Sequence, residues 1–233
     1  MNLLLQGLGE AYRLVVARDP LVMGAAWRSI WISWLAVGAA ATVGLPLGTI
    51  LARTRAPGSR LIVLVARAGM AVPTVFLGIF CYAIFSRRGP LGATDILYTT
   101  WAIVTGEFLL VWPIIVSITH GAVRSLDPRV AETAKTLGAG PLMRWRTYVS
   151  EARVGVLLGV LTAFARCVTE LGIAMMVGGN IRGRTRTLAT ATALETGKGE
   201  FGRGLAMGII LLLFALVVTV VIGSLTGETD KGT

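Results

Sequence analysis

The sequence predicts an all-α protein that crosses a membrane several times. Of its 233 residues, 55% are hydrophobic and only 15% are charged, and the mean hydropathy is +0.75. Soluble proteins average roughly 45–50% apolar and about 25% charged residues, so both deviations point to lipid. A helix needs about 20 mostly apolar residues to cross the hydrocarbon core, and two stretches between charged residues clearly exceed that length.

Five mostly apolar stretches are predicted to be transmembrane helices. They lie at about 29–52, 61–86, 96–119, 154–177 and 204–226. The first and the last contain no charged residue, whereas the other three carry Arg67, Glu107, and the pair Arg166 and Glu170. Together the five form a predicted transmembrane domain over 27–226, followed by a C-terminal tail at 227–233.

The first 26 residues are expected to form an N-terminal amphipathic segment. Apolar residues such as Leu4, Leu8 and Tyr12 recur at helical spacing, but Glu10 and Arg13 interrupt the stretch. This pattern is typical of a helix that lies on a membrane surface, and a sixth span is the alternative. The stretch lacks the features of a cleaved secretory signal, so we expect it to be retained.

The charges and cysteines narrow the function classes. A net charge of +10 suggests nucleic acid in a soluble domain, but in a membrane protein it reflects loop charges. The lysines and arginines of the predicted loops divide equally between the two sides of the membrane. They therefore do not indicate which side is cytoplasmic. Cys81 and Cys167 lie in apolar stretches, where cysteine behaves as a small hydrophobe. We expect no disulfide, metal site, bound cofactor or catalytic constellation in this chain.

Glycines four residues apart indicate close helix contacts. Gly44 and Gly48 have the spacing that lets transmembrane helices approach closely. Pro73 is expected to kink the helix in which it lies.

The longest polar connection, at 124–153, is predicted to fold as two short helices. Asp127 and Pro128 are a favourable N-cap and first helical residue. Gly138 suits the left-handed position that ends a helix, and Pro141 can begin a second one. A helical hairpin between two spans favours docking of a partner outside the bilayer, and the alternative is an interfacial hairpin that only caps the spans.

Within this connection, Glu132, Thr133, Ala134 and Gly138 resemble the Glu-Ala-Ala-x3-Gly motif of membrane subunits of ATP-binding-cassette importers. In that family the loop is cytoplasmic and inserts into a cleft of the ATPase subunit. The resemblance implies the type I importer transmembrane fold and a partner ATPase that binds ATP and Mg. It also implies these docking residues: Ala131, Glu132, Ala134, Leu137 and Gly138. Ser150 and Glu151 depart from the Leu-Pro that often follows in the family.

A cytoplasmic hairpin also orients the chain. With five spans it places the N-terminus outside and the C-terminus inside, in a prokaryotic inner membrane. Positive-inside counting does not supply this assignment, so it rests on the resemblance alone.

Charged residues within the spans are the other candidate functional group. Arg166 and Glu170 share one helical face, where they can pair with each other or with Glu107. A charge at mid-membrane costs about 2.5–3.5 kcal/mol on insertion scales, so we expect these residues to face the bundle interior. We expect these residues to line a pathway or to hold an interface together. The alternative is that they form an ion-pair network with a purely structural role.

The same region resembles the molybdate, tungstate and sulfate branch of these importers. The branch carries an aromatic-Ala-Arg segment, an acidic residue four positions later, and then Gly-Asn-Ile/Leu with a threonine-rich continuation. The matching residues here are Phe164, Ala165, Arg166, Glu170, Gly179, Asn180, Ile181, Gly183, Thr185, Thr187 and Leu188. The short five-span chain with MMVGGNIRG is most similar to the tungstate-type subunit.

An oxyanion pathway needs positive charge and hydrogen-bond donors. Arg182, Arg184, Arg186 and nearby threonine hydroxyls can supply both. The alternative is that these arginines hold lipid headgroups or the acidic surface of an extracytoplasmic binding protein.

We therefore expect a non-catalytic permease subunit of an ATP-driven oxyanion importer, with tungstate favoured over molybdate or sulfate. Because five spans are too few to enclose a pathway, a second copy of the chain is an expected partner. The other expected partners are cytoplasmic ATPase subunits, an extracytoplasmic binding protein and membrane lipid. Nucleic acid is not an expected partner. Two further hypotheses are an ion-gradient-driven transporter, in which Glu107 or Glu170 titrates, and a membrane scaffold without transport.

Overall fold

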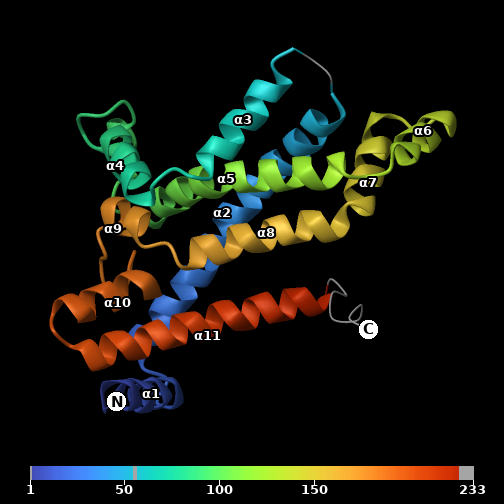
Figure 1. Cartoon of the computed structure of the whole chain (residues 1–233). Helices are drawn as coiled ribbons and strands as arrows, with labels where there is room; N and C mark the ends of the chain where they lie inside the picture. The colour runs from blue at the N-terminus through green and yellow to red at the C-terminus, as the bar shows by residue number, and fades with distance from the viewer. Residues whose placement is uncertain (1, 55–56, 226–233) are drawn as a thin grey trace. The chain divides into compact units, whose positions relative to one another are not determined.

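The computed structural model describes residues 2–54 and 57–225, and these form helices joined by short connections (Figure 1). The N-terminal segment folds as α1 (Asn2–Val16), and α2 (Pro20–Arg53) follows after a turn in which Arg18 has a φ of 49°. Asp19 ends this turn, because its Oδ1 accepts hydrogen bonds from the backbone N–H groups of Leu21 and Val22 at 2.9 and 3.1 Å. The predicted N-terminal helix is therefore present, while its place on a membrane surface stays a prediction.

The other elements follow in chain order. They are α3 (Ser59–Gly69), α4 (Thr74–Phe85), the short 3-10 helix η1 (Gly92–Thr94), α5 (Thr100–Arg124), α6 (Pro128–Thr136), α7 (Pro141–Glu151), α8 (Arg153–Val168), α9 (Gly172–Gly178), α10 (Leu188–Gly197) and α11 (Phe201–Leu225). No strand occurs in the residues that the structure describes, which confirms the all-α prediction.

Within the part of the chain that the structure describes, two single helices are long and apolar enough to cross a membrane, namely α2 and α5. Two helix pairs, α3 with α4 and α8 with α9, pass the same test only together, because the chain is broken at 70–73 and at 169–171. The fifth predicted span coincides with α11, of which Phe201–Val217 counts as a shorter apolar helix. The number of five spans stays a prediction, and the tail at 227–233 lies outside the described residues.

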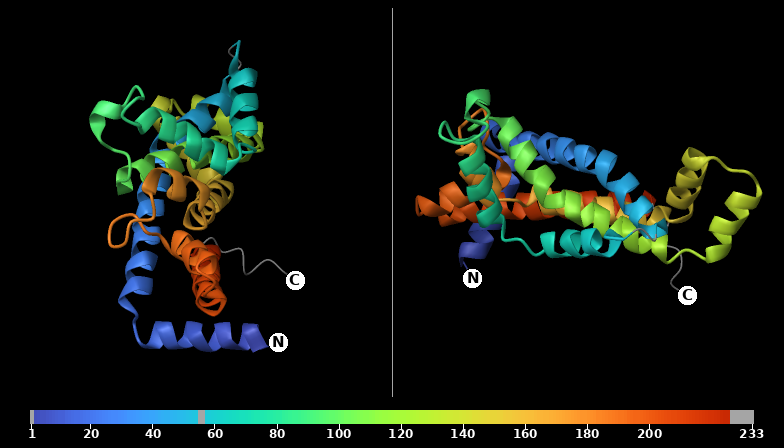
Figure 2. Two further views of the ribbon diagram at one scale, coloured as in Figure 1. Left: turned by 90° about the vertical axis from the view of Figure 1, so that its left-hand side faces the viewer. Right: turned by 90° about the horizontal axis from the view of Figure 1, so that it is seen from above.

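The chain divides into two compact units, and the first comprises Met1–Ala36, Pro73–Glu107 and Ala165–Thr233. In it α11 packs against both α1 and α10, as Figures 1 and 2 show. Their shared core consists of Ala11, Leu14, Val22, Ala25, Leu188, Ala191, Ala206, Met207 and Ile210. A Cβ on Gly7 would lie 2.6 Å from Leu205 Cδ2, so α1 crosses α11 in close contact at this glycine.

The second unit comprises Val37–Val72 and Phe108–Phe164 and has two small cores. One joins α3 and α5 to the end of α2, through Leu51, Val63, Ala66 and Val116. The other joins α2, α5, α7 and α8, through Ala52, Val123, Tyr148, Ala152 and Val156. A Cβ on Gly44 or Gly48 would lie 2.9 Å from Ile115 Cγ2 or 2.8 Å from the Val116 carbonyl oxygen, which confirms the predicted close helix contact.

Cys81 and Cys167 are both buried and free, so the prediction that they act as small hydrophobes is confirmed. Among the described residues, no group of three or more His, Cys, Asp or Glu side chains is placed to hold a metal ion.

Candidate functional site

The hairpin of α6 and α7 follows the predicted capping pattern. Asp127 Oδ1 accepts the N–H of Arg129 at 2.8 Å, and Pro128 is the first residue of α6. At the other end Gly138 has a φ of 72°, where a side chain is disfavoured. The N–H groups of Gly138 and Ala139 donate to the carbonyls of Lys135 and Ala134, both at 3.0 Å, and this pair of bonds is the Schellman arrangement that stops a helix.

The exposed surface of the hairpin carries apolar side chains beside charged ones such as Glu132 and Lys135. Leu137 is 80% exposed, and Leu142 and Met143 are also exposed. An open hollow of about 840 Å³ lies against this surface and is lined by residues that include Leu137, Gly138 and Met143. Unpartnered apolar side chains beside such a hollow are typical of a docking surface.

The structure separates the five predicted docking residues into two groups. Glu132, Leu137 and Gly138 are exposed. Ala134 is buried, and Ala131 packs against the core below the hairpin. The two alanines are therefore not part of the exposed surface. Their small side chains lie where α6 packs against its neighbours.

The base of the hairpin is fixed to α2 by an arginine that sequence reasoning did not single out. The guanidinium of Arg53 lies 4.7 Å from the ring centroid of Tyr148, within the range of a cation–π contact. Arg53 Nε and Nη2 are buried and have no hydrogen-bond partner in residues 2–54 and 57–225. The aromatic ring is therefore the main electrostatic partner of this cation.

In the first unit, Arg166 and Glu170 form the predicted ion pair, with Arg166 Nη1 at 3.2 Å from Glu170 Oε2. The Glu170 side chain is 1% exposed, whereas that of Arg166 is 43% exposed in the single chain. Glu170 is thus buried within its unit and Arg166 is partly exposed in the single chain, while the expectation that both face the interior of the bundle stays a prediction. The second oxygen of Glu170 accepts the N–H of Ile173 at 3.0 Å, so Glu170 also supports the start of α9 after the break at 169–171.

Glu107 in α5 does not pair with an arginine. It is 2% exposed, and its Oε2 has no hydrogen-bond partner among the described residues. Its polar neighbours are Ser33, Cys167 and Glu170. The carboxyl groups of Glu107 and Glu170 thus lie in the same buried region. Among the described residues, only that of Glu170 is paired with a cation.

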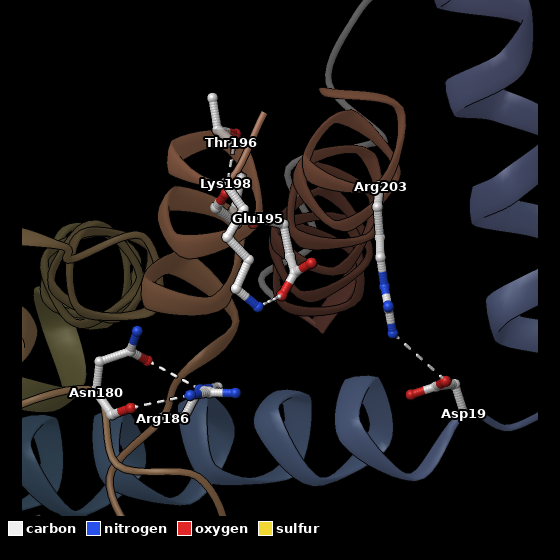
Figure 3. Close-up of polar contacts among 8 residues, drawn as sticks. Asp19, Asn180, Arg186, Glu195, Thr196, Lys198 and Arg203 are labelled. Carbon is white, nitrogen blue, oxygen red and sulfur yellow. Dashed lines mark hydrogen bonds and ion pairs between the residues drawn. The ribbon is translucent and has the colours of Figure 1, made fainter. Parts of the chain in front are cut away.

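The segment between α9 and α10 is fixed around Asn180 and Arg186. Asn180 has a φ of 51°, and its Oδ1 and backbone oxygen accept from Arg186 Nε at 3.1 Å and Nη2 at 3.2 Å (Figure 3). Gly183 is exposed with a φ of 78°, so it serves the turn. Arg182 and Arg184 are exposed, and within the described residues only Arg186 of the three is held by side-chain hydrogen bonds.

The threonines of this segment are buried and already hydrogen-bonded within the chain. Thr185 donates to the Gly178 carbonyl and accepts the N–H of Ile181 at 2.9 Å. Thr187 forms a capping box with Thr190 at the start of α10. The expected supply of threonine hydroxyls for an anion is therefore not seen, because these hydroxyls hold the segment itself.

Two residues of α2 dock this segment. Arg28 Nε donates to the Arg186 carbonyl at 2.8 Å, and the buried Ser29 hydroxyl accepts the N–H of Leu188 at 2.9 Å. Sequence reasoning missed both, because a serine and an arginine at a span end carry no local signal of a partner more than 150 residues away.

With this geometry in view, residues 44–227 match the family described as binding-protein-dependent transport system inner membrane component. The chain belongs to this family. Together with its apolar helices, membership makes it a multi-pass inner-membrane protein.

The relatives agree with the family assignment. The tungstate uptake system permease protein TupB of Peptoclostridium acidaminophilum is 33% identical over 228 residues, which cover 98% of this chain and 100% of the relative. The molybdenum transport system permease protein ModB of Azotobacter vinelandii is 31% identical over 75% of this chain and 83% of its own length. The resemblance to the tungstate-type permease inferred from the sequence is confirmed by these matches.

A solved structure has a fold similar to that of this chain. A chain of the MetNI methionine ABC transporter, in an inward-facing conformation, matches with a TM-score of 0.74 and 17% identity, covering 91% of this chain and 99% of that one. The fold is therefore that of an ATP-binding-cassette importer permease, as expected.

Proposed function

We propose that this chain is the membrane subunit of an ATP-driven tungstate importer, in which two copies form the pathway. The observation that carries the substrate is the identity of 33% with a tungstate uptake permease over nearly the whole of both chains. Molybdate is the alternative, because a molybdenum transport permease is 31% identical over three quarters of this chain.

The hairpin of α6 and α7 is the proposed coupling element. Its rigid Schellman stop and exposed apolar tip support docking into a cytoplasmic ATPase that binds ATP and Mg. Glu132, Leu137 and Gly138 would touch the ATPase, and Ala131 and Ala134 would let the hairpin pack tightly. The chain itself hydrolyses no ATP in this proposal.

The pathway or the interface between copies is proposed to include the polar residues of the first unit. These are Glu107, Arg166, Glu170, Asn180, Gly183, Thr185 and Thr187. The 43% exposure of Arg166 in the single chain supports this assignment, because an arginine within a span needs water or a protein partner. Asn180, Gly183, Thr185 and Thr187 act by shaping the segment between α9 and α10.

The remaining parts of the proposal concern orientation and partners. The chain has five spans, with its N-terminus outside and its C-terminus in the cytoplasm. An extracytoplasmic binding protein delivers the anion to the outer face. ATP-driven closure of the ATPases moves the two hairpins together and opens the pathway outward.

The test is ATP-driven uptake by the reconstituted complex, with the binding protein loaded separately with tungstate, molybdate and sulfate. We expect tungstate to give the largest stimulation of ATP hydrolysis and of uptake. A larger response to molybdate would transfer the substrate assignment to that anion. Uptake that requires an imposed proton or sodium gradient, and proceeds without ATP, would refute the proposal.

A further inference from the structure

Arg28 and Arg186 bring two positive charges together in the first unit. Arg28 Nε donates to the Arg186 backbone carbonyl at 2.8 Å. Arg186 is itself oriented by two hydrogen bonds to Asn180. The Arg28 side chain is therefore held against the backbone of Arg186, and both side chains are half-exposed.

Neither arginine has a carboxylate partner among the described residues. The ion pairs found there join Arg166 to Glu170, Lys198 to Glu195, and Arg203 to Asp19. The acid of each of these pairs is thus bound by a cation other than Arg28 or Arg186.

The remaining donors of the two guanidinium groups stay accessible. Arg28 uses Nε in its hydrogen bond to the Arg186 carbonyl, and Arg186 uses Nε and Nη2 in those to Asn180. The terminal nitrogens of Arg28 lie beside Gly24, where an added Cβ would be 3.4 Å away. No nitrogen of either guanidinium is among the buried atoms without a hydrogen-bond partner in the described residues. Both side chains are partly exposed, so each keeps donors that no described residue uses.

Two like charges held together are costly unless a counterion lies between them. A guanidinium presents a planar fork of donors that matches the oxygens of a tetrahedral anion. Two such forks carry the charge needed to balance a dianion.

We propose that Arg28 and Arg186 form a binding site for a tetrahedral oxyanion, with Asn180 as the residue that positions Arg186. The site deepens the proposed function, on which its assignment to the transported anion rests. Its chemistry equally fits the phosphate of a lipid headgroup, so the experiment separates these two sources.

The test uses the full complex of permease and ATPase in phosphatidylcholine nanodiscs, without binding protein or nucleotide. Tungstate binding is measured by equilibrium dialysis for the wild type and for Arg28→Gln and Arg186→Gln. Because each lost guanidinium removes charge-assisted hydrogen bonds, we expect at least about a tenfold loss of affinity in both variants. Arg28→Lys, which keeps the charge, should lose less.

Arg88→Gln is the matched control, because Arg88 is an exposed arginine of the same unit without an ion-pair partner among the described residues. It should bind tungstate as the wild type does. The unfolding midpoint of each complex is measured in parallel, so that a misfolded variant is recognised. An equal loss in Arg88→Gln would show a general charge effect and overturn the site.

A second arm replaces part of the phosphatidylcholine with phosphatidylglycerol and counts retained lipid by native mass spectrometry. Phosphatidylglycerol held by the wild type and lost in Arg186→Gln, without tungstate binding, would assign the site to a lipid headgroup. Retention of neither anion by the wild type would overturn the proposal, as would tungstate binding that is unchanged in both Arg28→Gln and Arg186→Gln. If wild-type vesicles still import tungstate with ATP in those cases, the site fails and the proposed function stands.

Discussion

Gly138 illustrates how one backbone angle decides the shape of a docking surface. Its φ of 72° places it in the left-handed region, while an added Cβ would meet nothing within 4 Å. Gly138→Ala therefore introduces backbone strain of about 1–2 kcal/mol without any steric clash. We expect weaker binding of the ATPase and several-fold fewer tungstate ions imported per ATP hydrolysed, both measured in proteoliposomes.

Gly140 provides the control for this prediction. It is two residues away, has a φ of −69° and also has open space around an added Cβ. Gly140→Ala should leave ATPase binding and the transport ratio unchanged. If the two alanine variants behave alike, backbone strain at Gly138 does not explain its role.

At the same scale, local capping residues could be predicted and distant partners could not. Asp127, Pro128 and Gly138 act on backbone groups within a few residues, so their spacing alone predicts the hairpin. Glu170 also supports a helix start, but only because the chain breaks at 169–171. That break is not visible in an apolar stretch with helical spacing.

Among the elements, the crossing of α2 and α5 depends on the absence of a side chain. A Cβ on Gly48 would lie 2.8 Å from the Val116 carbonyl oxygen, which is backbone and cannot rotate away. Gly48→Ala should therefore separate the helices and cost about 1–3 kcal/mol, as overpacking does. A lower unfolding midpoint of the purified protein measures this loss.

Gly38 lies on the same helix and has nothing within 4 Å of an added Cβ. Gly38→Ala should leave the midpoint unchanged or raise it slightly, because alanine favours helix more than glycine does. An equal fall in both variants would indicate a general effect of altering α2 rather than the contact with α5.

The breaks within two predicted spans show where sequence periodicity is insufficient. Hydropathy locates 61–86 and 154–177 correctly as apolar, but each contains two helices. Pro73 gives a local reason for the first break. The second depends on a tertiary contact, because Gly172 at the start of α9 lies against Thr74 and Val75 of α4.

For the whole molecule, the proposed orientation can be tested with introduced cysteines. Both native thiols are buried, so an impermeant maleimide should leave them unmodified. Gly9 and Gly140 have open space around an added Cβ. We expect Gly9→Cys to react in intact cells and Gly140→Cys to react only after the membrane is permeabilised.

The unmodified chain, treated in the same way, reports any reaction of Cys81 or Cys167. Labelling of Gly140→Cys from outside would place the hairpin on the outer face and contradict its role in ATPase coupling. Reaction of both variants only after permeabilisation would instead contradict the predicted location of the N-terminal segment.

The stacking of Arg53 on Tyr148 has a mechanical consequence. Tyr148 belongs to the hairpin, and Arg53 is the last residue of α2. The same unbroken helix carries Arg28 and Ser29, which hold the segment that begins α10. α2 thus carries two attachments in one continuous helix, with the hairpin held at Arg53 and the start of α10 held at Arg28 and Ser29.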